Sequence, residues 1–157
     1  MRRIEAACRA IAGSELGTSC HQVIGYGVDV PEYALELLLG YDGRQHYFAS
    51  GHYLRFEIKP VEKSRQVPHG IAYSLTLHQP DGKRLAGFDN AHPVPHRGAR
   101  HVRRKPEADH WHRTTRDPGR PYEFVSVERL LEDFFGEAER VLKEAGVAFE
   151  IVDEKEG

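Results

Sequence analysis

The chain has 157 residues, of which 39% are hydrophobic and 29% charged, and its formal net charge is −2. This length suits one domain with its own hydrophobic core, and the composition excludes a disordered chain. The near-neutral total excludes a polycation, so any contact with nucleic acid must come from a local basic patch.

The first 30 residues contain few structural signals. Charged residues interrupt the apolar core that a signal peptide would need, and no apolar run in the chain approaches the ~20 residues that cross a bilayer. We therefore expect a cytoplasmic protein without membrane contacts. Cys8 and Cys20 are expected to be reduced, because disulfides are rare in such proteins. We treat residues 1–30 as a possible N-terminal extension of a single domain and residues 31–152 as its core.

The segments that follow predict an antiparallel sheet. Residues 33–39 are apolar and Asp42-Gly43 follows them, a dipeptide typical of hairpins, so we expect a hairpin that returns over residues 45–48. Residues 53–61 and 71–77 alternate between apolar and polar side chains, as half-buried strands do. Pro80-Asp81-Gly82 predicts a tight turn into a strand over residues 84–88. Sequential strands joined by short turns form a meander.

The C-terminal part predicts one long helix over residues 126–145. Ser126 is a suitable N-cap and Glu128 suits the helix dipole in the first turn. Apolar residues then recur every three or four positions and form one stripe, and Gly146 is typical of a helix end. Residues 147–152 are expected to form a last strand. The predicted fold class is α+β, with a curved antiparallel sheet packed against this helix.

Residues 89–121 lack hydrophobic periodicity and contain five prolines. We expect a long loop or a pair of short irregular strands, and loops of this length are usually functional or disordered. Residues 97–120 contain eight basic and three acidic side chains, a local net charge of +5, whereas residues 121–157 carry −7. The basic segment suits phosphate binding, although it could equally be a solvated loop that pairs with the acidic helix.

Polar side chains cluster at both ends of this segment. Asp89, Asn90 and His92 follow directly on a predicted strand. Further along the chain, His110 and His112 are two positions apart, so on an extended segment both side chains point to the same side.

Three interpretations of these residues remain open. In the first, His110 and His112 act as acid and base on RNA, Asp89 orients one imidazole, and His92 is the reserve candidate. In the second, the His-x-His pair and a further His or Asp hold a metal ion. In the third, the polar side chains only cap turns and bond to backbone carbonyls.

Other residues are candidates for binding a substrate. Arg55, Lys59 and Arg113 could hold phosphate groups. Asn90 could line the site beside Asp89. Trp111 could stack on a base, or it could anchor the loop to the core.

Five motifs together resemble a known family. In chain order they are HGIAYSLTL at residues 69–77, GFDNAH at 87–92, DHWH at 109–112, PYEF at 121–124 and LLEDF at 130–134. In this order they resemble the TumE-type toxins of bacterial type II toxin–antitoxin systems, over roughly residues 50–143. Family members often show an Asp-Asn pair after a strand and then a His-x-His-like segment, which here are Asp89-Asn90 and His110/His112. This chain departs from the pattern in having Trp111 between the histidines and a basic insertion over residues 97–105.

The resemblance implies a growth-inhibiting toxin that a cognate antitoxin protein neutralises. Together with the residues above, it favours a metal-independent ribonuclease that acts on cellular RNA and needs no cofactor. The alternatives are a non-catalytic module that binds protein or nucleic acid, and a metal-dependent hydrolase that uses the His-x-His segment. A homodimer through an exposed edge strand is also possible.

Overall fold

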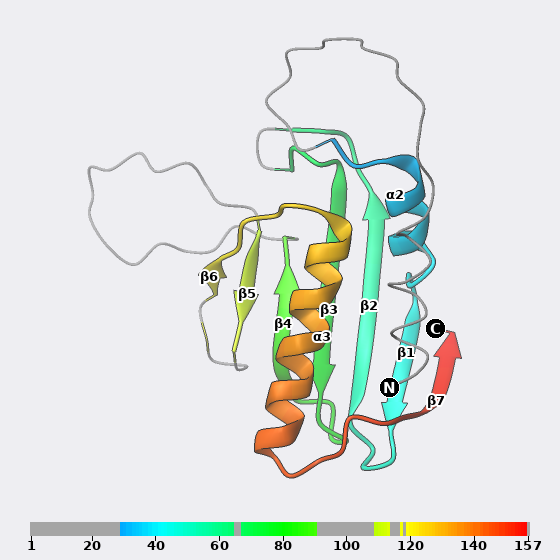
Figure 1. Cartoon of the computed structure of the whole chain (residues 1–157), viewed down its shortest axis with the longest axis vertical. Coiled ribbons are helices and arrows are strands. Elements are labelled where there is room, and N and C mark those ends of the chain that lie inside the picture. The colour runs from blue at the N-terminus through cyan, green and yellow to red at the C-terminus, as the bar shows by residue number, and fades with distance from the viewer. Residues whose placement is uncertain (1–28, 65–66, 91–108, 114–116, 118, 157) are drawn as a thin grey trace, which may run out of the picture.

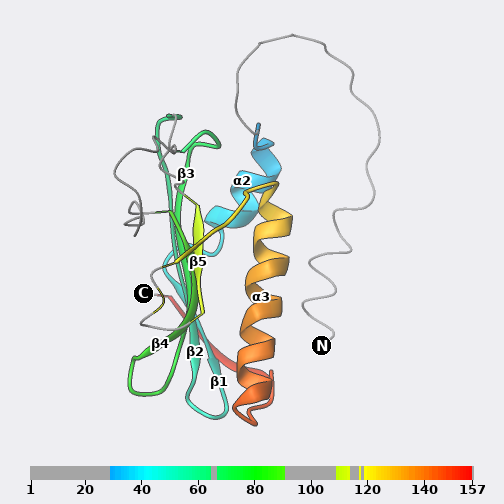
Figure 2. The same ribbon diagram turned by 90° about the vertical axis from the view of Figure 1, so that its left-hand side faces the viewer.

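The computed structural model describes residues 29–64, 67–90, 109–113, 117 and 119–156. Within these residues the fold is α+β: seven strands form one open sheet, and two helices cover one of its faces (Figures 1 and 2). The predicted fold class is therefore confirmed. In chain order the elements are α2 (Glu32–Leu39), β1 (Arg44–Phe48), β2 (Tyr53–Pro60), β3 (Ile71–His78), β4 (Arg84–Asp89), β5 (His110–His112), β6 (Arg120–Pro121), α3 (Val127–Glu144) and β7 (Ile151–Glu156).

The strands follow the order β6-β5-β4-β3-β2-β1-β7, and all neighbours are antiparallel. Strands β1 to β4 form the predicted meander. Several predicted features lie outside the described residues: both cysteines, His92 and the basic segment 97–105. The same holds for the possible N-terminal extension up to residue 28. Among the described residues, no helix is both long and apolar enough to span a membrane.

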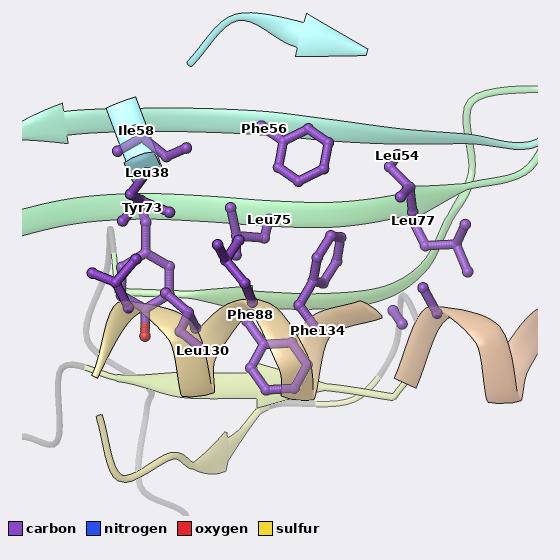
Figure 3. Close-up of a cluster of buried hydrophobic side chains, with 14 of the residues drawn as sticks. Leu38, Leu54, Phe56, Ile58, Tyr73, Leu75, Leu77, Phe88, Leu130 and Phe134 are labelled. Atoms are coloured by element: carbon purple, nitrogen blue, oxygen red, sulfur yellow. The ribbon is translucent and has the colours of Figure 1, made fainter. Parts of the chain in front are cut away.

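The two faces of the sheet differ in character. On the side that we call the helix face, Leu54, Phe56 and Ile58 of β2 lie opposite Leu77, Leu75 and Tyr73 of β3. All six side chains are at most 2% exposed, because α2 and α3 pack over this face (Figure 3). The residues that alternate with them along β2 are exposed on the other side, which we call the outer face.

Helix α3 has the predicted position and ends. Ser126 caps its N-terminus, since its side chain accepts a hydrogen bond from the Arg129 backbone N–H at 3.2 Å. At the other end Gly146 has a positive φ of 71°, and the Val147 N–H reaches back to the Leu142 carbonyl at 2.9 Å. This is the usual glycine-terminated helix end.

The prediction of a strand over residues 33–39 is wrong, because this segment is helix α2. Its sequence EYALELLL is rich in strong helix formers and contains no β-branched residue. Ala34 and Leu38 are one turn apart and both are buried. Gly43 still makes the expected turn, with φ 75°, but strand β1 that follows pairs with β2 and β7 instead of residues 33–39.

The last strand is displaced from its predicted position over residues 147–152. Val147 and Phe149 instead pack against the core in the connection from α3, with the Phe149 ring 5.1 Å from that of Phe48. Strand β7 begins at Ile151, where the chain reaches Phe48 of β1. It therefore includes acidic residues that lie beyond the predicted strand. Charged side chains are common on edge strands because they discourage pairing with other chains.

His46 of β1 should make the fold sensitive to acid. Its imidazole is 6% exposed and lies 5.0 Å from the Phe56 ring. Burial lowers the pKa of His46 below its ordinary value of 6.5, so the unfolded chain takes up a proton more readily than the folded one. The folded state therefore has its full stability with respect to His46 above pH 6.5, where the imidazole is neutral in both states. This contribution to stability is lost as the pH falls through the lower pKa of the folded state.

We expect the free energy of unfolding to decrease between about pH 8 and pH 5, and the His46→Leu variant to show a smaller decrease. Denaturant titrations at both pH values measure the difference. An equal decrease in the wild type and the variant would show that His46 is not the source of the acid sensitivity.

Candidate active site

Strand β5 places both histidines of the DHWH motif beside Asp89. It lies beside β4 in the sheet (Figure 1). In this pairing His110 is opposite Asp89, and His112 is opposite Gly87. Since side chains alternate along a strand, His110 and His112 share the outer face with Asp89. The expectation that the two imidazoles point to the same side is confirmed.

We call Asp89, His110 and His112 the Asp89 cluster. The His110 Nε2 lies 2.8 Å from one carboxylate oxygen of Asp89, and the His112 Nε2 lies 3.4 Å from the other. The two rings are nearly perpendicular, with centroids 4.8 Å apart. All three residues are at most 3% exposed. Three buried ionisable groups around one point are costly unless they are paired, and such groups concentrate at functional sites.

A turn after β5 fixes the orientation of the His112 ring. Its Nδ1 lies 2.8 Å from the backbone carbonyl oxygen of Asp117. A carbonyl oxygen only accepts hydrogen bonds, so Nδ1 carries the proton. The carboxylate of Asp117 holds this turn by accepting hydrogen bonds from the backbone N–H groups of Arg113 and Gly119, both at 3.1 Å. Burial lowers the pKa of His112 and favours its neutral form, in which Nε2 has a lone pair directed toward Asp89.

Arg84 is a neighbour of the cluster that sequence reasoning missed. Its Nη1 lies 3.7 Å from Asp89 Oδ2. Regular alternation along β4 would place Arg84 on the helix face with Phe88. However, the register between β3 and β4 shifts by one residue at Leu85, so that Arg84 pairs with His78 on the outer face. No pattern in the sequence marks this β-bulge.

Comparison with known proteins identifies the family. A family model described as toxin TumE matches residues 16–142, which include the whole Asp89 cluster. The chain belongs to the TumE toxin family. No curated protein and no solved structure gives a significant match. The match begins well before residue 50, where the resemblance in the motifs begins.

A second group of polar side chains in this member of the TumE family surrounds the partly buried Asp109, which sequence reasoning did not select. Its Oδ1 accepts hydrogen bonds from Tyr73 Oη at 2.8 Å, from His69 Nε2 at 3.2 Å and from Asn90 Nδ2 at 3.3 Å. The His69 Nδ1 accepts from the backbone N–H of Ile71, so Nε2 carries the proton that it donates. We call these four side chains the Asp109 network: Asp109, His69, Tyr73 and Asn90.

The Asp109 network is satisfied by the protein itself. Asn90, a predicted substrate-binding residue, accepts from the Tyr73 backbone N–H at 2.9 Å and donates to the Ile71 carbonyl at 2.8 Å. Its side chain thus continues the pairing of β4 with β3 beyond Asp89. This placement supports a role in holding the end of β4 in position.

Removing one donor from this network should cost stability. The Tyr73→Phe variant loses a hydrogen bond to the partly buried carboxylate of Asp109, and bonds to charged groups contribute about 1.5–3 kcal/mol. We expect the free energy of unfolding to fall by this amount, measured by denaturant titration. Tyr47→Phe is the matched control, since the Tyr47 hydroxyl donates to the neutral Gln45 side chain at 2.8 Å. An equal loss of unfolding free energy in both variants would contradict a stabilising role of the Tyr73 hydrogen bond to Asp109.

The other predicted substrate-binding residues lie apart from the Asp89 cluster. Trp111 is on the helix face, with its ring centroid 6.1 Å from that of Phe88 and 5.1 Å from the Arg120 guanidinium carbon. Arg55 and Lys59 are on the outer face of β2, two strands from β4, which is roughly 10 Å. Arg55 pairs with Glu57 at 2.6 Å. Arg113 is exposed just after β5. The structure therefore brings Asp89, His110 and His112 together. It does not bring these four predicted substrate-binding residues into the cluster.

Proposed function

We propose that this TumE-family toxin is a ribonuclease whose reactive centre is the Asp89 cluster. The observation that supports the proposal is the convergence of two imidazoles on one buried carboxylate, in a chain that belongs to a toxin family. Imidazole and carboxylate are the groups that move protons or hold metal ions near neutral pH.

Cationic side chains on the same face support a phosphodiester substrate. The guanidinium of Arg84 lies beside the cluster and is 26% exposed, so it can reach a phosphate oxygen next to Asp89. Arg55 and Lys59 are two further cations on the outer face, two strands away on β2, although Arg55 is paired with Glu57. A guanidinium is well suited to phosphate because its planar donors match two oxygens.

The arrangement of nitrogen atoms bears on the chemistry. If His110 and His112 were acid and base without a metal ion, one nitrogen of each ring would have to reach the RNA. In the structure both Nε2 atoms face Asp89, and the Nδ1 of His112 donates to Asp117. This geometry favours the alternative in which a metal ion activates the attacking oxygen.

Incubation of the purified protein with total cellular RNA tests the proposal. We expect cleavage by the wild type and none by the His110→Ala variant. His78→Ala is the matched control, because His78 lies on the same face but bonds to Gly82 and Thr76 instead of the cluster. Intact RNA in the wild-type sample, or cleavage by a folded His110→Ala protein, would contradict the proposal.

We also propose that a protein antitoxin neutralises this toxin, as membership of a toxin family suggests. Coexpression of the protein encoded beside it should restore growth to cells that express the toxin. Persistent growth arrest would contradict this pairing.

A further inference from the structure

We propose that the Asp89 cluster binds one divalent ion of the first transition row, with Zn²⁺ as the best match. Its ligands would be a carboxylate oxygen of Asp89 and the Nε2 atoms of His110 and His112. The inference concerns the same centre as the proposed ribonuclease, but it does not depend on RNA being the substrate.

The spacing of the donor atoms supports the site. One donor atom from each residue can be chosen so that all three lie within 4.8 Å of one another. Ligands about 2.0–2.1 Å from Zn²⁺ in a tetrahedral arrangement are about 3.3 Å apart. Each imidazole nitrogen is near this distance from an Asp89 oxygen: His110 Nε2 is 2.8 Å from Oδ1, and His112 Nε2 is 3.4 Å from Oδ2.

The hydrogen bond of His112 matches that of a metal ligand. Histidines that bind metals usually donate the other ring N–H to a carboxylate or a backbone carbonyl. The His112 Nδ1 donates to the Asp117 carbonyl in this way, which leaves the Nε2 lone pair facing Asp89 Oδ2. This nitrogen and the facing carboxylate oxygen are the kinds of donor atom that a divalent ion binds.

The backbone holds the three ligands in place without the ion. Asp89 and His110 are directly paired residues of β4 and β5, and His112 is two residues further along β5. Strand β4 is itself paired with β3 on its other side. A sheet of this kind keeps the donor atoms near the positions that binding requires, so little ordering accompanies binding.

The donor set selects the kind of ion. Two imidazole nitrogens and one carboxylate oxygen suit Zn²⁺ and its neighbours, whereas Mg²⁺ and Ca²⁺ prefer oxygen ligands throughout. Three protein ligands leave a position open for water or a phosphate oxygen, as in catalytic zinc sites. The single carboxylate leaves the bound ion with net positive charge, and Arg84 adds a second positive group at 3.7 Å from Asp89. Ion and guanidinium would together attract an anionic substrate.

Calorimetric titration of the full-length, chelator-treated protein with Zn²⁺ tests the site. We expect one ion per chain in the wild type, and binding weaker by at least about 100-fold in Asp89→Asn and His112→Gln. His78→Gln is the control for the other histidines and should bind as the wild type does. Titration of the wild type with Co²⁺ is a second readout that needs no variant, because a four-coordinate site with nitrogen ligands gives strong visible absorption.

The absence of both Zn²⁺ binding and the Co²⁺ absorption in the wild type would overturn the inference. So would equal affinity in the wild type and in folded Asp89→Asn and His112→Gln proteins. A protein that binds Zn²⁺ at the cluster and leaves RNA intact supports the metal site and contradicts the ribonuclease. A protein that cleaves RNA but binds no metal ion contradicts the metal site alone.

Discussion

Cells that express the Asp89→Asn variant are expected to grow like cells without the toxin. Asp89 contacts both imidazoles of the cluster, at 2.8 and 3.4 Å. Asparagine keeps the size of the side chain but removes its charge, and an NH2 group that cannot accept a hydrogen bond or bind a metal ion replaces one oxygen. We expect RNA cleavage to fall by about 10²–10⁴-fold, measured as growth after induction and as cleavage by the purified variant.

Asp81→Asn is the matched control for this variant. Asp81 lies in the exposed turn between β3 and β4, far along the chain from the cluster, and its side chain accepts a hydrogen bond from the Lys83 backbone N–H. This control should remain fully toxic. Full toxicity of a folded Asp89→Asn protein would show that the Asp89 cluster takes no part in the toxic reaction.

The Phe134→Ala variant is expected to lose about 3–5 kcal/mol of unfolding free energy, the usual cost of truncating a buried phenylalanine. Phe134 of α3 is fully buried and is the point where the helix meets the middle of the sheet (Figure 3). Its ring lies edge-on to Phe56 at 5.7 Å and to Phe88 at 6.2 Å. Because a small domain is stable by only 5–15 kcal/mol, denaturant titration should show a large shift of the midpoint.

Val125→Ala provides the comparison, since Val125 is 58% exposed just before α3. Its unfolding free energy should change by no more than about 0.5 kcal/mol. A similarly small change in Phe134→Ala would mean that α3 does not pack on the sheet as described.

Elements with one buried face could be predicted from the sequence. Strands β2 and β3 and helix α3 each place apolar side chains toward the core and polar ones away from it, so the period of the pattern reveals the structure. The error at α2 has the opposite cause. Residues 33–39 are apolar at nearly every position, and a short run without a period does not distinguish a strand from a helix. Its helix-forming composition was the better guide.

The candidate site could be predicted only in part. The spacing of His110 and His112 was sufficient to place both on one side of a strand. Their contact with Asp89 depends on the pairing of β5 with β4, which joins residues about 20 positions apart and has no local signal. Arg84 was missed because a β-bulge reverses its side, and Asp109 because its partner His69 is 40 residues away.

The most direct test of RNA cleavage at the Asp89 cluster is a map of RNA 5′ ends in cells, made shortly after induction of the toxin and before growth stops. The account predicts new, discrete 5′ ends in cells with the wild type that are absent in cells with equal amounts of the His110→Ala or Asp89→Asn protein. Growth arrest by the wild type without new RNA ends would contradict it.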